Sequence, residues 1–137
     1  ANGVLLIPGG IGTRREVNNE HYLRTIADLC GEAQYVLTVC TGSGLLAKTG
    51  VLDGLRATSN KIAFDWAVEQ GPRVQWVRKA RWVRDGKYYT SSGVSAGIDM
   101  TLGFVRDTMG EPAAHTIARG IEYLWNNDAD NDPFYVE

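Results

Sequence analysis

Apolar and polar residues alternate along the chain in two patterns. Residues 4–7 and 35–39 are short apolar runs that each end at a glycine-bearing turn, as is typical of strands buried in a parallel sheet. Residues 18–30 instead space their apolar side chains three and four apart, which predicts a helix with one buried face that includes Cys30. This alternation predicts an α/β fold with a mostly parallel sheet, in which residues 4–7 form a central strand buried on both faces.

The middle of the chain extends this pattern. We expect a short strand at residues 56–59 and a helix at residues 62–69, which ends at a Gly-Pro pair. Residues 81–90 then alternate with a period of two around an Asp-Gly pair, Asp85-Gly86. An Asp-Gly pair between two such runs is a strong signal for a β-hairpin.

The last third of the sequence predicts a long helical region that breaks at residues 110–112, resumes through Leu124 and is followed by a tail. Ser95 is the expected N-cap of this helix, and Asp99 is expected in its first turns, where a negative charge complements the helix dipole. Residues 126–132 are polar and acidic, and we expect them to form a frayed tail.

Composition narrows the class of protein. The 137 residues are 44% hydrophobic and 22% charged, with a formal net charge of −2, which fits one globular domain over residues 1–137. No block of like charge marks a nucleic-acid or membrane surface, and no apolar stretch approaches the length of a membrane span. Two cysteines are too few for a disulfide framework, and the cysteines and histidines lack zinc-ligand spacing. We therefore expect a cytoplasmic protein without a metal, a nucleic-acid partner or a membrane partner.

Cys40 has the position of a catalytic nucleophile. It follows the apolar run at residues 35–39 and precedes a glycine-rich turn, residues 41–44, that opens the next apolar segment. A sharp strand-to-helix turn lifts its central side chain above the sheet, and the helix N-terminus behind it stabilises negative charge. Free cysteines are also commonly small buried hydrophobes, so position alone leaves both interpretations open.

Two glycine-bearing turns match nucleotide-binding patterns in part. Residues 9–12, Gly-Gly-Ile-Gly, lack the Lys-Ser/Thr ending of a P-loop, but they supply unobstructed backbone N–H groups at the end of a strand. Residues 42–47 match G-x-G-x-x-A, although the nearest following acid, Asp65, lies inside the next predicted helix rather than at a strand end. Phosphate binding and NAD binding are therefore alternatives to a catalytic role for these turns.

The turn at residues 91–99 also admits two interpretations. The structural one is that it starts the long helix. The functional one is that Ser91 or Ser92 faces Cys40 across the crevice at the ends of the strands.

Five segments follow one another in the order of a known family. They are LLIPGG at residues 5–10, VCTG at 39–42, RAT at 56–58, DG at 85–86 and SGVSAGID at 92–99. In this order they resemble the ThiJ/PfpI superfamily, and the match runs over residues 4–134. Thr41 after the cysteine, with IEY at 121–123 and DPF at 132–134, is similar to the isonitrile hydratase branch. Related transcription regulators share the GVSAGID spelling but continue into a helix-turn-helix domain.

The resemblance implies a fold and a site. The fold is the class I glutamine amidotransferase-like α/β fold, a flavodoxin-like three-layer sandwich with a mostly parallel sheet and a β-hairpin. In the site, Cys40 is the nucleophile and the N–H groups of Gly10 and Thr41 stabilise an anion. The implied reaction is hydration of an isonitrile to an N-substituted formamide through a thioimidate, with no cofactor. The residues expected to contact this small-molecule substrate are Gly9, Ile11, Asn60 and Ser92.

The sequence departs from the family in two ways. The family's catalytic carboxylate follows the first strand of the fold, whereas this sequence begins at what corresponds to a later strand, so an N-terminal strand-helix-strand unit is expected to be missing. Asn60 stands where many relatives carry histidine, and His21 and His115 are expected to be surface or packing residues.

Both departures leave alternatives open. An apolar strand without a neighbour invites association, so we expect a homodimer, or completion of the sheet by an N-terminal segment or a second chain. The alternative functions are a catalytically impaired ligand-sensing or interaction domain and a glyoxalase-like or amidase-like enzyme.

Overall fold

A four-stranded sheet forms the centre of the molecule. The computed structural model describes residues 3–135, and the strand order in this sheet is β1-β2-β6-β5. The strands are β1 (Val4–Ile7), β2 (Tyr35–Thr38), β5 (Trp82–Asp85) and β6 (Tyr88–Ser91). Strands β1, β2 and β6 are parallel, and β5 is antiparallel to β6. The predicted mostly parallel sheet is therefore confirmed.

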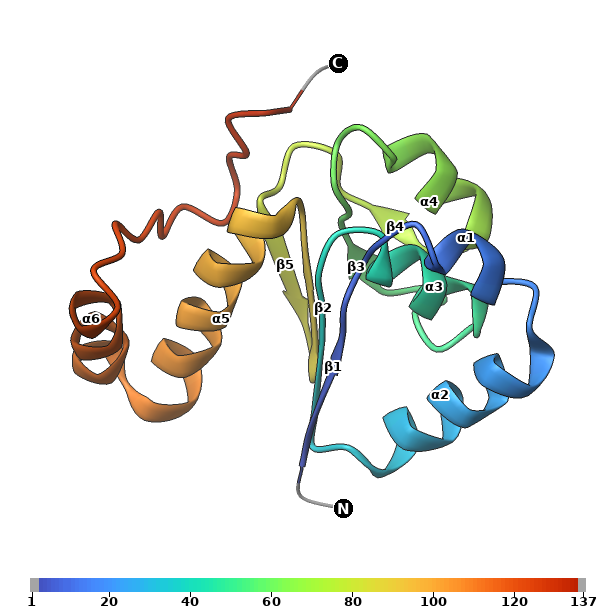
Figure 1. The fold of residues 1–137 in the computed structure, drawn as a ribbon, viewed down its shortest axis with the longest axis horizontal. Helices are drawn as coiled ribbons and strands as arrows, with labels where there is room; N and C mark the ends of the chain where they lie inside the picture. Colours follow the sequence, from blue (N-terminus) through green and yellow to red (C-terminus); the bar gives the residue numbers. More distant parts are fainter. Residues whose placement is uncertain (1–2, 136–137) are drawn as a thin grey trace.

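Helices cover both faces of this sheet (Figure 1). One side carries α1 (Thr13–Glu16), α2 (Glu20–Glu32), α3 (Gly42–Lys48) and α4 (Phe64–Gln70). The other side carries α5 (Val94–Met109) and α6 (Glu111–Gly120). A second sheet of two parallel strands, β3 (Arg56–Ala57) and β4 (Gln75–Trp76), adjoins β5, whose Asp85 carboxylate accepts the Arg56 N–H at 2.9 Å. The three layers are those of the predicted flavodoxin-like sandwich. None of the helices in residues 3–135 combines the length and apolarity that crossing a bilayer requires.

The predicted hairpin is present at β5 and β6. Asp85 pairs with Tyr88, which leaves Gly86 and Lys87 as a two-residue loop. Gly86 has a φ of 61°, a left-handed conformation that glycine adopts without a steric penalty. Gly86 thus supplies the backbone geometry that this tight hairpin needs, whereas Asp85 is the last residue of β5.

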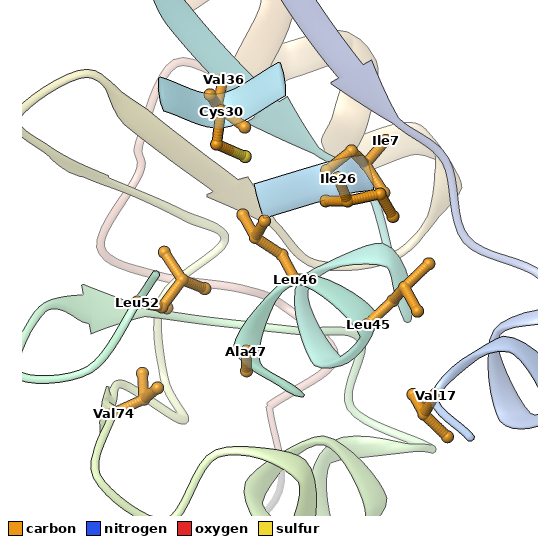
Figure 2. Close-up of a cluster of buried hydrophobic side chains, with 11 residues drawn as sticks. Ile7, Val17, Ile26, Cys30, Val36, Leu45, Leu46, Ala47, Leu52 and Val74 are labelled. Carbon is orange, nitrogen blue, oxygen red and sulfur yellow. The ribbon is translucent and has the colours of Figure 1, made fainter. Parts of the chain in front are cut away.

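The main hydrophobic core lies between the sheet and the layer of α2 and α3. Figure 2 shows Cys30 of α2 beside Val36 of β2 and Ile26 of α2 beside Ile7 of β1, with Leu46 of α3 below them. Cys30 is fully buried in this cluster, as predicted from its helical face. A second cluster covers the opposite face and contains Leu37, Trp82, Tyr89 and Met100.

The prediction for residues 4–7 is wrong in one respect. β1 pairs with β2 alone and forms the edge of the described sheet, and Val4 and Leu6 are 51% and 56% exposed. A continuous apolar run indicates a strand that is covered by apolar side chains on both faces. The run does not show whether these side chains belong to residues 3–135. It therefore stays a prediction that β1 is covered in a homodimer, or that an N-terminal segment or a second chain completes the sheet.

Several predicted boundaries are also wrong. Helix α5 starts at Val94 with Gly93 as its N-cap, so Ser95 lies inside the helix. Helix α2 starts after Asn19, whose side chain accepts a hydrogen bond from the Tyr22 N–H at 3.1 Å. The strand predicted at residues 56–59 ends at Ala57, because Thr58 N–H donates to a side-chain oxygen of another strand rather than to a neighbouring strand's backbone.

The tail predicted to fray at residues 126–132 is instead anchored to the domain. The carbonyl oxygen of Ala129 accepts the Arg81 N–H at 2.7 Å, and the Asp132 N–H donates to the Lys79 carbonyl at 2.9 Å. Asp132 is only 5% exposed. A polar, acidic composition predicts solvation, but here one of the acids is paired with buried cations.

Candidate functional site

Cys40 lies at a strained turn between β2 and α3. Its φ is +58°, in the left-handed region that residues other than glycine rarely adopt. Its N–H donates to the Ser92 carbonyl at 2.9 Å, and its own carbonyl accepts the Ser59 hydroxyl at 3.0 Å. These contacts from two other segments hold the strained conformation in place. The strand-turn-helix geometry expected around Cys40 is present, and backbone strain of this kind clusters at functional sites.

The turn after β1 packs directly against this elbow. A Cβ atom on Gly9 would lie 2.7 Å from the Cys40 Cβ, and one on Gly42 would lie 2.5 Å from the Ile7 carbonyl oxygen. Both distances are shorter than real Cβ contacts allow, and the Gly42 neighbour is backbone. Glycine at residues 9 and 42 therefore permits the close approach of the β1 turn to the elbow.

Gly42→Ala is expected to lower the free energy of unfolding by about 1–3 kcal/mol, because the new methyl group meets the backbone of β1 and the turn that follows it. Gly31→Ala is the matched control, since no atom lies within 4 Å of the added Cβ and alanine is the better helix former. That control is expected to be stabilising by about 0.5–1 kcal/mol. Urea unfolding of both variants measures the difference, and equal stabilities would contradict the packing argument.

Gly10 and Thr41 are brought together by hydrogen bonds. The Gly10 N–H donates to the Thr41 hydroxyl oxygen at 3.0 Å. The Thr13 hydroxyl, which the sequence did not single out, lies 3.0 Å from the same oxygen and 2.7 Å from the Gly10 carbonyl. In this structure the Gly10 N–H thus points at Thr41, and an anion would have to replace the hydroxyl as its acceptor. The Thr41 N–H has no hydrogen-bond acceptor among residues 3–135.

Cys40 opens into a pocket of about 410 Å³, which we call the Cys40 pocket. Its lining residues are Cys40, Asn60, Lys61, Ile62, Arg81, Ser92, Gly93, Val94, Ser95, Ala96, Asp132 and Phe134. Of the residues singled out from the sequence, Asn60 and Ser92 line it with Cys40. Gly9, Gly10, Ile11 and Thr41 are not among its lining residues, and Ile11 is 89% exposed. Ser91 also stays outside, with its buried hydroxyl donating to the Thr38 carbonyl at 3.0 Å.

A buried ionic network forms one wall of the Cys40 pocket. The Arg81 guanidinium pairs with Asp99 at 2.7 Å and with Asp132 at 3.3 Å. The three side chains are between 0% and 7% exposed. Asp99 was expected to complement the dipole of α5, but it is instead the buried partner of Arg81. Nothing in the sequence near Arg81 or Asp132 signals this pairing.

Lys61 completes the network from the other side of Asp132. Its ammonium group lies 3.6 Å from the Asp132 carboxylate and donates to the Ala80 carbonyl at 2.7 Å. Burial lowers the pKa of Lys61 to about 8, and the Asp132 carboxylate opposes this shift. Lys61 is thus charged below about pH 8 and begins to lose its charge just above neutrality.

The two cysteines lie in opposite environments. Cys30 is fully buried, and this burial raises the pKa of its thiol to about 11, with Lys87 acting in the other direction. Cys40 is partly exposed in the Cys40 pocket. A thiol has to ionise and be reached before it reacts with an alkylating agent.

Iodoacetamide at pH 8 is expected to label Cys40 and to leave Cys30 unmodified. At this pH the Cys30 thiol stays protonated, because pH 8 lies far below its raised pKa of about 11. Peptide mass spectrometry of the singly labelled protein identifies the modified residue. Preferential labelling of Cys30 would contradict the difference in accessibility.

The histidines lie away from this site. His21 and His115 are both exposed, as predicted. Within the part of the chain that the structure describes, no three His, Cys, Asp or Glu side chains form a group that could hold a metal ion.

Known proteins resemble the chain in sequence. The model of the DJ-1/PfpI family matches residues 1–107. The isonitrile hydratase of Pseudomonas putida is 35% identical over 120 residues, which are 88% of this chain and 51% of that protein. The HTH-type transcriptional regulator GbdR of Pseudomonas aeruginosa is 29% identical over 119 residues, which are 87% of this chain and 32% of the regulator. The chain thus spans about half the length of the hydratase and a third of the regulator.

Solved structures give the same family. A ThiJ/PfpI family protein from Pseudomonas syringae matches with a TM-score of 0.78 and 33% identity, over 96% of this chain and 51% of that one. DJ-1beta of Drosophila melanogaster shares the fold with a TM-score of 0.74 at 20% identity, over 89% of this chain and 64% of that one. The order of strands and helices, the cysteine elbow and the family match agree: the chain belongs to the DJ-1/PfpI family.

Proposed function

We propose that Cys40 is the nucleophile of a site that hydrates small isonitriles to N-substituted formamides. The observation that carries this proposal is the strained, partly exposed Cys40 at the head of a pocket of about 410 Å³. A pocket of this size accommodates a small organic molecule. The choice of reaction draws on the 35% identity to an isonitrile hydratase.

The proposed reaction has two steps. In the first, the Cys40 sulfur bonds to the terminal carbon of R-NC and the thiol proton moves to that carbon, which gives the thioimidate R-N=CH-S-Cys40. In the second, water adds to the carbon and its proton moves to nitrogen. The C–S bond then breaks, the sulfur regains a proton, and R-NH-CHO leaves. The net reaction is isonitrile plus water to formamide, with no oxidant or cofactor.

Backbone donors are proposed to assist the first step. The Thr41 N–H has no acceptor among residues 3–135. The Gly10 N–H donates to the Thr41 hydroxyl and would exchange this acceptor for the substrate. Donors of this kind stabilise charge that develops as the sulfur attacks. In the Cys40 pocket, Asn60 is proposed to contact the substrate.

Proton NMR of the protein with benzyl isocyanide tests the proposal. The expected result is a formyl proton signal from N-benzylformamide that grows with protein concentration. Protein alkylated at Cys40 with iodoacetamide is the control and is expected to be inactive. Isonitrile that stays unchanged in the presence of native protein would overturn the proposed function.

A second candidate function is ligand sensing without turnover. It is favoured by the ionic network, because the two cations Lys61 and Arg81 are paired with the two carboxylates of Asp99 and Asp132, so that the network carries no net charge at the wall of the pocket. The similarity to transcriptional regulators over 87% of this chain supports the same candidate. Saturable binding of benzyl isocyanide by calorimetry, without formamide, is the result that this candidate predicts.

A further inference from the structure

Ser92 is joined to a carboxylate at the wall of the Cys40 pocket. Its hydroxyl donates to Asp132 Oδ2 at 2.6 Å, a short hydrogen bond of the charge-assisted kind. Ser92 is 2% exposed, and its carbonyl accepts the Cys40 N–H at 2.9 Å. The serine is thus fixed both to the elbow and to the segment that follows α6.

Asp132 is itself held from several sides. Its Oδ1 accepts the Phe134 N–H at 3.2 Å and lies 3.3 Å from the Arg81 guanidinium, while Lys61 lies 3.6 Å from Oδ2. These donors keep the carboxylate in one orientation. The single hydroxyl hydrogen of Ser92 is committed to Asp132, so its oxygen has only lone pairs to offer to the pocket. Ser92 is therefore a hydrogen-bond acceptor at the wall of the Cys40 pocket.

We propose that Ser92 accepts a hydrogen bond from the water that releases a covalent adduct from Cys40, and that Asp132 is the positioning residue of this step. The inference rests on the proposed function of Cys40 as a nucleophile. The water oxygen bonds to the adduct carbon, the C–S bond breaks, and the departing sulfur takes up one proton of the water. The other proton moves to the nitrogen of a thioimidate, which gives the formamide, or stays with the carboxylic acid released from a thioester. Ser92 orients the water and disperses the positive charge that develops on it.

The chain offers a matched serine for comparison. Ser95 also lines the Cys40 pocket, but it is exposed and its hydroxyl has no carboxylate partner among the described residues. An oriented acceptor is thus expected at Ser92 and not at Ser95.

Hydrolysis of an acetyl group on Cys40 tests this inference without an isonitrile. p-Nitrophenyl acetate transfers its acetyl group to an accessible thiol with release of p-nitrophenolate, and the thioester then needs water to form acetate and free thiol. In Ser92→Ala, we expect acetylation at the wild-type rate and loss of the acetyl group slowed by about 10- to 100-fold. Ser95→Ala is expected to match the wild type in both steps. Intact-mass spectrometry follows both steps, and thermal melting checks that each variant is folded.

The outcomes separate this inference from the proposed function. Acetyl-Cys40 that is lost at equal rates in the wild type and Ser92→Ala, or that is stable in both, would overturn the role of Ser92. Slow release of the acetyl group in Ser92→Ala, but not in the wild type or Ser95→Ala, supports the role of Ser92. If this result is found and the isonitrile assay gives no formamide, isonitrile is the wrong substrate and the role of Ser92 is unaffected. Asp132→Asn is expected to slow release by about 10-fold, with the exposed Asp130→Asn as its control. Should Asp132→Asn fail to fold, Ser92→Ala still decides the inference.

Discussion

Cys40→Ser is expected to lower formamide production from benzyl isocyanide by at least about 10³-fold, because a serine hydroxyl does not ionise near neutral pH and is a far weaker nucleophile than a cysteine thiolate. The substitution replaces one atom and leaves the backbone contacts of the elbow in place. Initial rates from NMR at matched protein concentration measure the loss.

Cys30→Ala is the control for this substitution. Cys30 is fully buried in the core between α2 and β2, so its removal is expected to affect stability and to leave the rate within about threefold of the wild type. A Cys40→Ser variant that kept more than a tenth of the wild-type rate would contradict the assignment of Cys40 as nucleophile. Loss of activity in Cys30→Ala with an unchanged melting curve would also contradict the assignment of Cys40 as the nucleophile.

Arg81→Met is expected to lower the free energy of unfolding by about 3–5 kcal/mol, because it leaves two buried carboxylates without their shared cation. Asp99 is 0% exposed and Asp132 is 1% exposed at the side chain, so neither regains the hydration that it has in the unfolded chain. Urea unfolding followed by tryptophan fluorescence measures the change.

Arg15→Met is the matched surface control. The Arg15 side chain is 82% exposed, and its pair with Glu16 is expected to contribute less than about 1 kcal/mol. A free energy of unfolding for Arg81→Met that lies within about 1 kcal/mol of the wild-type value would contradict the stabilising role of the ionic network. The same variant is also expected to release the segment that carries Asp132, which increases its proteolysis after residue 125.

The parts of the fold that the sequence predicted well are those governed by short-range chemistry. The Asp85-Gly86 hairpin and the elbow at Cys40 each depend on residues within a few positions of one another, and both are present. The boundaries around Thr58 and Ser95 were predicted less well. Thr58 is diverted from its strand by the Thr90 side chain, and the start of α5 is capped by Gly93. A long-range hydrogen bond such as that between Thr58 and Thr90 cannot be predicted from the local propensities of the residues.

The candidate site shows the same division. Cys40 was found from its place between an apolar strand and a glycine-rich turn, and Asn60 and Ser92 join it in the pocket. Arg81 and Asp132 were missed, because they are 51 positions apart and the segment around Asp132 has the composition of a solvated tail. Their pairing depends on how the segment after α6 crosses to β5, which only the assembled fold determines.

Mass spectrometry of the protein quenched in acid within seconds of mixing with benzyl isocyanide tests directly whether Cys40 bonds to the substrate. We expect an adduct whose mass equals that of one isonitrile, located by peptide mapping on Cys40, that appears before the formamide and decays as the formamide forms. Formamide production without any adduct, or an adduct on Cys30 alone, would contradict the claim that Cys40 is the nucleophile.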